Sequence, residues 1–334
     1  METKRELVLK ALHGEKTDRI PVGFWYHYMP YEEMNLAMKS PEIFEKNING
    51  HRKLKKIFKP DFLKIMTDGL FFLPFDYAAL QSAADLKGLE PIPETHPWFD
   101  KNVELVRTLR EMYGDDILIY FNMFAPMTQM RDGIRVFQGI SFDIDRVIDF
   151  LKEDAEAVKH ALLVFAQSLE TLMKKVIGKG LADGVYFSVS NPHGDIPTDI
   201  YKKYIMPSEK FVLEKAKELS EDNILHICGN VGGKEMFSIY QDYDVRAVNW
   251  AIHASGLSLK EGREYFKGKA IIGGFDNSPE SVLCSGTKEE VEACAEQVVQ
   301  EAGRDGLILG ADCTIPSDID LERLEWVRRK AAAL

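Results

Sequence analysis

Short apolar segments alternate with amphipathic helical segments along the whole chain of 334 residues. Eight of the apolar segments have the length and composition of buried strands. Strands that alternate with helices pair in parallel, through right-handed crossovers. Eight such units close into a barrel, so we predict an α/β fold with a single (β/α)8 TIM-barrel domain over residues 1–334. The predicted strands are residues 20–26, 62–67, 117–123, 184–190, 223–227, 247–252, 269–275 and 306–311.

Composition limits the partners that such a chain can have. The net charge is −11, and the sequence has no basic run and no interleaved basic and aromatic stripe, which argues against nucleic-acid binding. The charged segment 1–6 leads into an amphipathic helix rather than a signal peptide, and the apolar runs are too short to span a membrane. Four cysteines in a chain of this length do not make a disulfide framework. We therefore expect a reduced, soluble, cytoplasmic protein without a nucleic-acid or membrane partner.

A histidine and a cysteine two residues apart stand at the end of the predicted strand 223–227. Side chains alternate along a strand, so His226 and Cys228 point to the same face. Cys313, just after the strand 306–311, would supply a third ligand. A His/Cys/Cys set leaves the fourth tetrahedral position of zinc free, as catalytic zinc sites do. The alternative is a core histidine with two small buried cysteines.

The predicted architecture favours the metal site over that alternative. Active sites of (β/α)8 barrels lie at the carboxyl ends of the strands. All three candidate ligands fall at these ends, and so should face one mouth of the barrel. His253 and Asp276 follow the sixth and seventh predicted strands and should face the same mouth. We therefore predict a zinc ion there.

Two separate parts of the sequence resemble the uroporphyrinogen decarboxylase superfamily. One is the opening, residues 5–14 with Thr-Asp-Arg-Ile-Pro-Val at 17–22. The other is Ile-Ile-Gly-Gly-Phe-Asp at 271–276 with Ser-Gly-Thr-Lys-Glu-Glu-Val at 285–291, which resembles the seventh strand of that family and the helix after it. The resemblance extends over nearly the whole chain.

The metal motif resembles one branch of that superfamily. His226-x-Cys228 with the distant Cys313 is similar to the zinc motif of the corrinoid-dependent methyltransferases, such as the methyltransferase I of O-demethylases. In that branch a zinc enzyme passes methyl groups to or from the cobalt of a separate corrinoid protein. The resemblance therefore implies Zn²⁺ and a corrinoid (cobalamin) carried by a partner protein as cofactors.

The sequence departs from the decarboxylases after the first strand. Those enzymes carry Arg-Gln-Ala-Gly-Arg-Tyr there, to hold a polycarboxylate tetrapyrrole, whereas this chain has Trp-Tyr-His-Tyr-Met-Pro-Tyr at 25–31, without arginine. Carboxylates would then lack bidentate guanidinium partners. Asp68 does fall where the decarboxylase aspartate would align, which keeps a decarboxylase-like enzyme as an alternative.

Several more residues near strand ends are candidates for the substrate site. We predict Asp68 and Asp276 as catalytic acid–base groups, although a structural hydrogen bond at a strand end would explain each equally well. An aromatic cavity with few arginines fits a flat aryl methyl ether better than a small anionic thiol. For the two histidines among the candidates, a structural role is the stronger alternative. The predicted substrate-binding residues are Trp25, Tyr26, Tyr28, Phe121, Tyr186, His193 and His253.

The leading hypothesis is a zinc-dependent methyltransferase that moves a methyl group from an aryl methyl ether to the cobalt(I) of a corrinoid protein. Zinc could stabilise the leaving phenolate, or it could hold an acceptor thiol as thiolate. The second possibility corresponds to a methylcorrinoid:thiol methyltransferase. Two further hypotheses are a uroporphyrinogen decarboxylase-like enzyme and a non-catalytic barrel with structural zinc.

Overall fold

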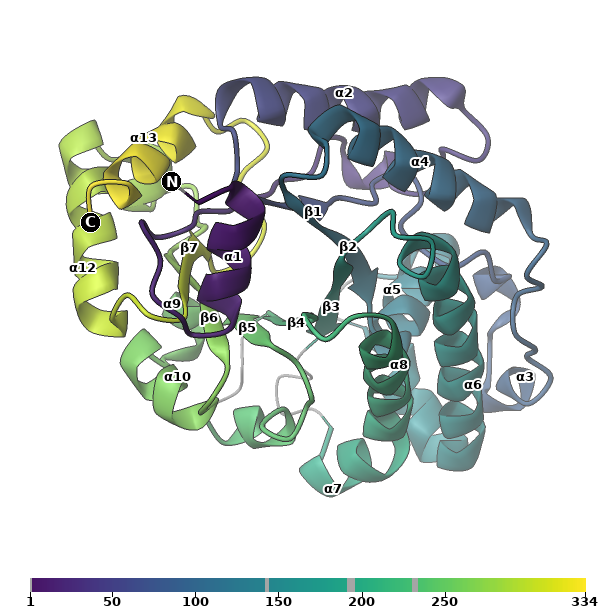
Figure 1. Cartoon of the computed structure of the whole chain (residues 1–334). Helices are drawn as coiled ribbons and strands as arrows, with labels where there is room; N and C mark the ends of the chain where they lie inside the picture. Colours follow the sequence, from purple (N-terminus) through teal and green to yellow (C-terminus); the bar gives the residue numbers. More distant parts are fainter. Residues whose placement is uncertain (1, 142–143, 191–195, 230–233) are drawn as a thin grey trace.

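The computed structural model describes residues 2–141, 144–190, 196–229 and 234–334. Its centre is one sheet of seven parallel strands that follow one another in sequence order, with helices around it (Figure 1). Both ends of every strand lie within two residues of a predicted strand. The strands are β1 (Phe62–Ile65), β2 (Leu118–Phe124), β3 (Gly184–Ser190), β4 (Ile224–Cys228), β5 (Ala247–Trp250), β6 (Ala270–Phe275) and β7 (Leu307–Ala311).

The first predicted strand, 20–26, is an irregular extended segment that closes this sheet into a barrel. It lies parallel to β7 through a bridge between Val22 and Leu309. The Gly23 amide donates to the Leu309 carbonyl at 2.9 Å, and on the other side the Asp61 amide donates to the Val22 carbonyl at 3.0 Å. Pro21 has no N–H to donate, so it contributes only its carbonyl, which accepts from the Leu309 amide at 2.9 Å. The predicted (β/α)8 barrel is confirmed, with seven regular strands and this segment in the eighth position.

The helices surround the barrel, and several begin at a recognisable cap. A capping box, in which Ser or Thr is followed three residues later by Glu, begins α1, α10 and α12. The helices are α1 (Lys4–Leu12), α2 (Pro41–Ile57), α3 (Ala83–Leu86), α4 (Pro97–Tyr113), α5 (Pro126–Gln138), α6 (Arg146–Val176), α7 (Thr198–Ile200), α8 (Met206–Leu219), α9 (Ile252–Ser255), α10 (Leu259–Tyr265), α11 (Val282–Ser285), α12 (Lys288–Ala302) and α13 (Glu322–Ala331). Short helical turns are η1 (Tyr31–Glu33), η2 (Tyr77–Ala79), η3 (Tyr201–Ile205, a π-helix) and η4 (Lys234–Ile239).

Two separate apolar clusters fill the fold. Alternate residues of the strands, including Phe62, Tyr120 and Tyr186, point into the barrel and pack with residues of α1. The intervening residues, such as Phe121 and Phe187, pack against the surrounding helices. Both faces of each strand are therefore buried, as expected of a parallel sheet.

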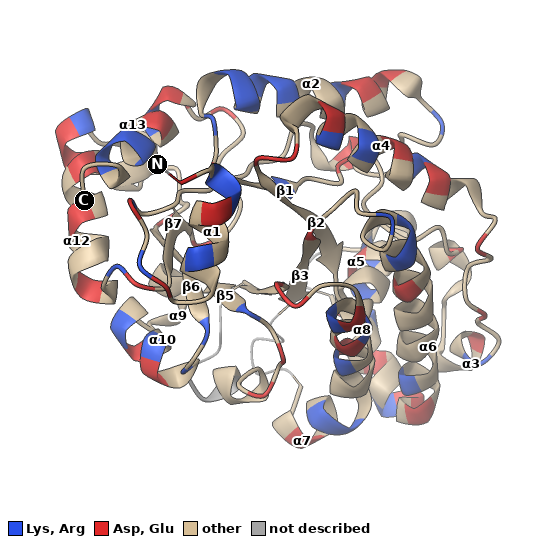
Figure 2. Ribbon diagram, in the orientation of Figure 1, with Lys and Arg blue, Asp and Glu red and all other residues tan. Residues whose placement is uncertain are grey.

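Charged residues lie mainly on the outer helices (Figure 2). The strands in the centre of the same view carry few of them. Within the described residues, no helix combines the length and apolar character that crossing a bilayer requires.

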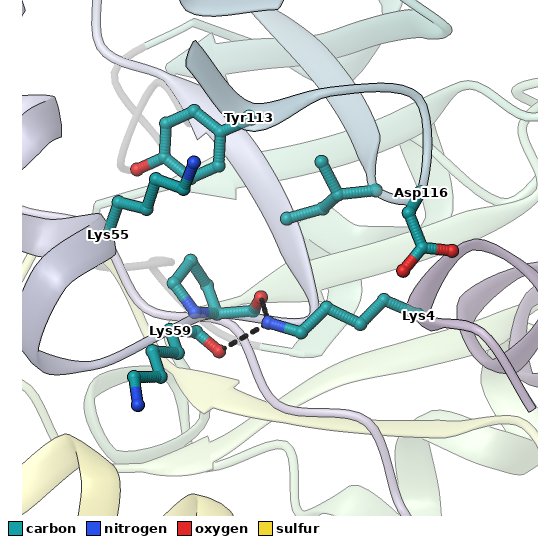
Figure 3. Close-up of a pocket in the computed structure, with 7 residues that line it drawn as sticks. Lys4, Lys55, Lys59, Tyr113 and Asp116 are labelled. Atoms are coloured by element: carbon teal, nitrogen blue, oxygen red, sulfur yellow. Dashed lines mark hydrogen bonds between the residues drawn. The ribbon is translucent and has the colours of Figure 1, made fainter. Parts of the chain in front are cut away.

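A pocket of about 320 Å³ lies beside the amino end of β1 (Figure 3). The Lys4 ammonium donates to the carbonyls of Lys59 at 2.7 Å and Pro60 at 2.5 Å, and so joins α1 to the segment that leads into β1. The Lys55 ammonium lies 5.4 Å from the centre of the Tyr113 ring. Because active sites of such barrels lie at the opposite, carboxyl end, we assign these lysines a structural role.

A carboxyl group is buried between α8 and the segment after η4. Glu209 is 1% exposed, and the Tyr201 hydroxyl donates to both of its oxygens, at 2.8 and 2.9 Å. The Tyr243 hydroxyl donates to the same carboxyl group, and the Tyr240 hydroxyl lies 3.3 Å from that of Tyr201. Burial raises the pKa of Glu209 to about 7, and the hydrogen bonds from the two tyrosines act against that shift.

We expect Glu209 to make the protein less stable as the pH rises. The folded state keeps the proton up to about pH 7, whereas the unfolded carboxyl group loses it near 4.5. Stability therefore falls between these two values, by about 3 kcal/mol for a shift of this size, and is constant above them.

Urea unfolding of the wild type and Glu209→Gln at pH 5, 6 and 8 measures this effect. The stability of the wild type relative to Glu209→Gln should fall by roughly that amount across the series. Tyr243→Phe, which removes a hydrogen bond that favours the carboxylate, should make the fall steeper. Parallel pH profiles for the wild type and Glu209→Gln would contradict the assignment.

Candidate metal centre

His226, Cys228 and Cys313 meet at the carboxyl end of the barrel. The two sulfur atoms lie 3.7 Å apart, and the Cys313 sulfur lies 3.4 Å from Nε2 of His226. All three ligand atoms lie within 4.8 Å of one another. Tetrahedral zinc with Zn–S of about 2.3 Å and Zn–N of about 2.0 Å would place its ligands about 3.8 Å (S to S) and 3.5 Å (S to N) apart. The two closest separations therefore fit a zinc ion with little movement.

Strand alternation brings these residues together. His226 and Cys228 are two residues apart on β4 and share its interior face. Gly229 ends the strand with φ +90°, a conformation that glycine adopts readily. Cys313 follows β7 by two residues, across the barrel from β4. The grouping predicted from the sequence is thus present in the structure.

One thiol proton forms a hydrogen bond between the two sulfur atoms. A hydrogen bond from the Cys228 thiol lowers the pKa of Cys313, and His226 and Lys64 lower it further. The same hydrogen bond raises the pKa of Cys228. A divalent metal that displaces this proton would be held by both thiolates.

Asn249 fixes the tautomer of His226. The Asn249 side-chain N–H₂ donates to the carbonyls of Ile272 at 2.8 Å and Ala311 at 3.0 Å, so its oxygen must face the histidine. This oxygen lies 2.5 Å from Nδ1 of His226. Nδ1 therefore carries a proton, and Nε2, which faces Cys313, is the nitrogen that would bind a metal. Such a partner orients a histidine for metal binding.

We expect Asn249→Ala to weaken metal binding by about 10- to 100-fold, because His226 would lose the partner that sets its tautomer and ring orientation. Competition with a chromogenic chelator measures the dissociation constant. Asn122→Ala is the matched control, since Asn122 is another interior amide but bonds to Ser188 rather than to a ligand. Equal affinities in the two variants would argue against the role of Asn249.

Both predicted catalytic aspartates make hydrogen bonds at strand ends, Asp68 with a neighbouring segment and Asp276 within its own. Asp68 is 1% exposed and accepts from the Tyr28 amide at 2.7 Å, with Nδ1 of His27 at 2.9 Å. Asp276 accepts from the amide of Ser278 at 2.8 Å and from its hydroxyl at 2.9 Å. These contacts match the structural alternative, and the catalytic role of both residues stays a prediction.

His253, one of the two predicted histidines, is held in place by Asp312. Nδ1 of His253 lies 3.0 Å from the Asp312 carboxylate, which also accepts from the His253 amide at 2.7 Å. This hydrogen bond raises the pKa of His253. The carboxylate next to Cys313 thus anchors His253 at the barrel mouth. His193 lies outside the described residues.

The predicted aromatic substrate residues are divided among three places. Trp25 and Tyr186 are buried inside the barrel, with their ring centres 5.1 Å apart. Tyr26 and Tyr28 line a pocket of about 530 Å³ beside α2. Phe121 faces away from the barrel interior, in the core between β2 and the helices. These residues therefore do not form one aromatic wall around the triad.

Two residues of this region were not predicted from the sequence. In the sequence, Asn249 is one residue of the predicted apolar strand 247–252 and carries no signal of its own. Lys64 is one polar residue within the run 62–67, but it lies inside the barrel and is 5% exposed. A lysine in a strand that is buried on both faces was the available signal.

Comparison with known proteins gives a family and two curated relatives. Residues 75–333 match the family described as uroporphyrinogen decarboxylase (URO-D). A methylcobamide:CoM methyltransferase MtbA of Methanosarcina acetivorans is 26% identical over 202 residues, which are 59% of this chain and 53% of that protein. The protein of the same name from Methanosarcina mazei is 27% identical over 213 residues, or 62% and 56% of the two chains. This chain thus spans about half the length of the curated relatives it matches.

Two solved structures share the fold. A methyltransferase from Methanosarcina mazei has a TM-score of 0.68 at 17% identity, covering 100% of this chain and 99% of that chain. A B12-independent methionine synthase from Shewanella sp. W3-18-1 has a TM-score of 0.58 at 13% identity, covering 94% and 97%. Both likenesses extend over the whole barrel described above.

Proposed function

The chain belongs to the uroporphyrinogen decarboxylase (URO-D) family, and from this premise we propose that it is a zinc-dependent methyltransferase that acts with a corrinoid protein. The observation that carries the proposal is the His226, Cys228 and Cys313 cluster, with ligand separations that suit zinc. Two relatives named methylcobamide:CoM methyltransferase support the same class of reaction. A corrinoid domain could reach the cluster because it lies at a strand-end mouth of the barrel.

A thiol is the best-supported small molecule for this reaction. The two curated relatives are named for CoM, which is a thiol. The aromatic residues that favoured an aryl methyl ether are spread over three places, which weakens that preference.

An aryl methyl ether remains the second candidate because of one aromatic group near the ends of β1 and β2. The rings of Phe71 and Phe124 lie 4.4 Å apart, and that of His27 lies 5.8 Å from Phe71. Such a group could hold a flat ring.

Each residue of the centre has a distinct part in the proposed chemistry. Nε2 of His226 and the thiolates of Cys228 and Cys313 would bind the zinc, while Asn249 keeps the proton of His226 on Nδ1. Zinc, when bound, supplies a Lewis acid that holds a thiol as thiolate or stabilises a departing phenolate.

A purely structural zinc and a decarboxylase activity receive less support. A structural zinc would require a fourth protein ligand. In the part of the chain that the structure describes, the cluster contains three ligand residues, which suits an open fourth position. A uroporphyrinogen decarboxylase needs cationic partners for its substrate, and segment 25–31 contains no arginine.

Methyl transfer in both directions tests the proposal. Zinc-loaded protein is incubated with methylcob(III)alamin and a panel of thiols, and separately with cob(I)alamin and methoxyarenes, methanol, methylamines or methylated thiols. We expect the cobalt absorbance to change with thiols in the first assay. Phenol release in the second assay would instead establish the ether as substrate. No transfer to or from any corrinoid would refute the proposed function, as would coproporphyrinogen formation from uroporphyrinogen at ordinary turnover.

A further inference from the structure

A lysine lies inside the barrel, close to the metal centre. Lys64 is on β1, and its neighbours on the same face, Phe62 and Met66, belong to the interior cluster. The Lys64 ammonium lies 4.6 Å from the centre of the Trp25 ring and 4.3 Å from that of Tyr186. The side chain is therefore held between two aromatic faces, and it is 5% exposed.

This buried ammonium has no partner of the usual kind. Throughout the described segments, no carboxylate or hydrogen-bond acceptor pairs with it. The indole N–H of Trp25 and the hydroxyl of Tyr186 are also buried without a partner. Aromatic faces attract a cation but do not replace the hydration that it loses on burial. A charge in this position requires negative charge nearby.

The metal ligands share the barrel interior with Lys64 and, as thiolates, would supply that negative charge. Burial lowers the pKa of Lys64 to about 8, and Cys313, Cys228 and Asp68, in that order, act against the shift. Asp68 already accepts from His27 and the Tyr28 amide.

The ring of Tyr186 provides the physical link between Lys64 and the centre. It contacts the Lys64 ammonium on β1 and lies 6.0 Å from the ring of His226 on β4. Lys64 and His226 are thus both neighbours of the Tyr186 ring inside the barrel. In this position the cation acts on the centre through space.

We propose that Lys64 is the counter-charge of the metal centre and selects small molecules that bind it as anions. This inference rests on the proposed function. Two thiolates and a divalent metal sum to zero, so a bound thiolate or phenolate leaves one negative charge in a buried site. Protonated Lys64 restores neutrality, and the proton lost by a thiol leaves to solvent. Lys64 touches no reacting atom and is a positioning residue.

The consequence is a preference for anionic over neutral ligands. A cation in the same barrel interior should favour binding of an anion by about 10- to 100-fold. A neutral donor such as imidazole gains nothing from Lys64. The comparison of an anionic with a neutral ligand therefore separates charge from packing.

Cobalt(II)-substituted protein provides the measurement, because its visible absorption reports ligands on the metal without any turnover. We would titrate wild type, Lys64→Met, Lys64→Gln and Lys64→Arg with 2-mercaptoethanol and with imidazole at pH 7.5. The two neutral variants should bind the thiol about 10- to 100-fold more weakly than wild type. Lys64→Arg should recover most of the loss, and imidazole should bind all four proteins alike.

Each contrary outcome has a distinct meaning. If the wild type fails to bind cobalt, the proposed metal centre is refuted. If all four proteins bind cobalt and the thiol with equal affinity, the role of Lys64 is refuted while the centre stands. An equal loss of thiol and imidazole affinity in the neutral variants would show a packing effect and would also overturn the inference. Circular dichroism identifies any variant that fails to fold, and two neutral variants are included for that reason.

Discussion

Cys228→Ala and Cys313→Ala are each expected to release the metal and abolish methyl transfer while the barrel stays folded. Each variant leaves two ligands, and a Cys/His pair alone does not retain zinc in the way a three-ligand site does. Elemental analysis of the purified proteins should give one zinc per chain for the wild type and little for either variant. Cys284→Ala and Cys294→Ala are the matched controls, because these cysteines are also partly buried but lie on α11 and α12, away from the triad.

The fold should tolerate this loss because its core does not depend on the metal. The barrel interior and the layer beneath the helices are two separate apolar clusters. The free energy of unfolding of the metal-free protein should therefore change by about 1 kcal/mol or less. Full retention of zinc by both variants would rule out the site, and loss of the fold would make the metal structural.

The barrel and the ligand set could be predicted because each depends on the order of apolar and polar residues within short segments of the sequence. Every strand is a short apolar run bounded by helical or turn sequence, so its position can be predicted to within two residues. His226 and Cys228 lie on one strand, so alternation alone places them on the same face. Cys313 requires only that parallel strands end at a common mouth.

The aromatic residues could not be placed in the same way. A parallel strand inside a barrel is apolar on both faces, so its pattern does not reveal which face is interior. Phe121 and Tyr120 are adjacent on β2 and both buried, yet only Tyr120 points into the barrel. For the same reason the sequence did not indicate that Lys64 points toward Trp25, since that requires the register between segments.

Segment 20–26 has the sequence of a regular strand, but its place in the barrel depends on side chains that precede and follow it. The Arg19 guanidinium donates to both oxygens of Asp61, at 2.7 and 2.6 Å. The Val22 amide donates to the same carboxylate at 2.9 Å, and the Asp61 amide donates back to the Val22 carbonyl. Asp61 is fully buried and joins segment 20–26 to the start of β1, on the side of the segment opposite β7.

We expect Asp61→Ala to lower the free energy of unfolding by about 3 to 5 kcal/mol, as the loss of one partner from a buried ion pair does. The variant leaves the Arg19 guanidinium and the buried Val22 amide without their acceptor. Urea unfolding of wild type, Asp61→Ala, Arg19→Met and the double variant measures the effect and the coupling between the two side chains.

The two single variants should not be equivalent. Arg19 is partly exposed, with 22% of its side chain accessible, whereas the Asp61 side chain is fully buried, so Arg19→Met should cost less than Asp61→Ala. Glu104→Ala, which breaks the exposed pair with Lys101, is the control and should cost at most about 1 kcal/mol. If Asp61→Ala costs no more than this control, the barrel is closed by the backbone hydrogen bonds of 20–26 alone. A larger cost would instead mean that this carboxylate stabilises the segment carrying Trp25, and through it the contact between the Trp25 ring and the Lys64 ammonium.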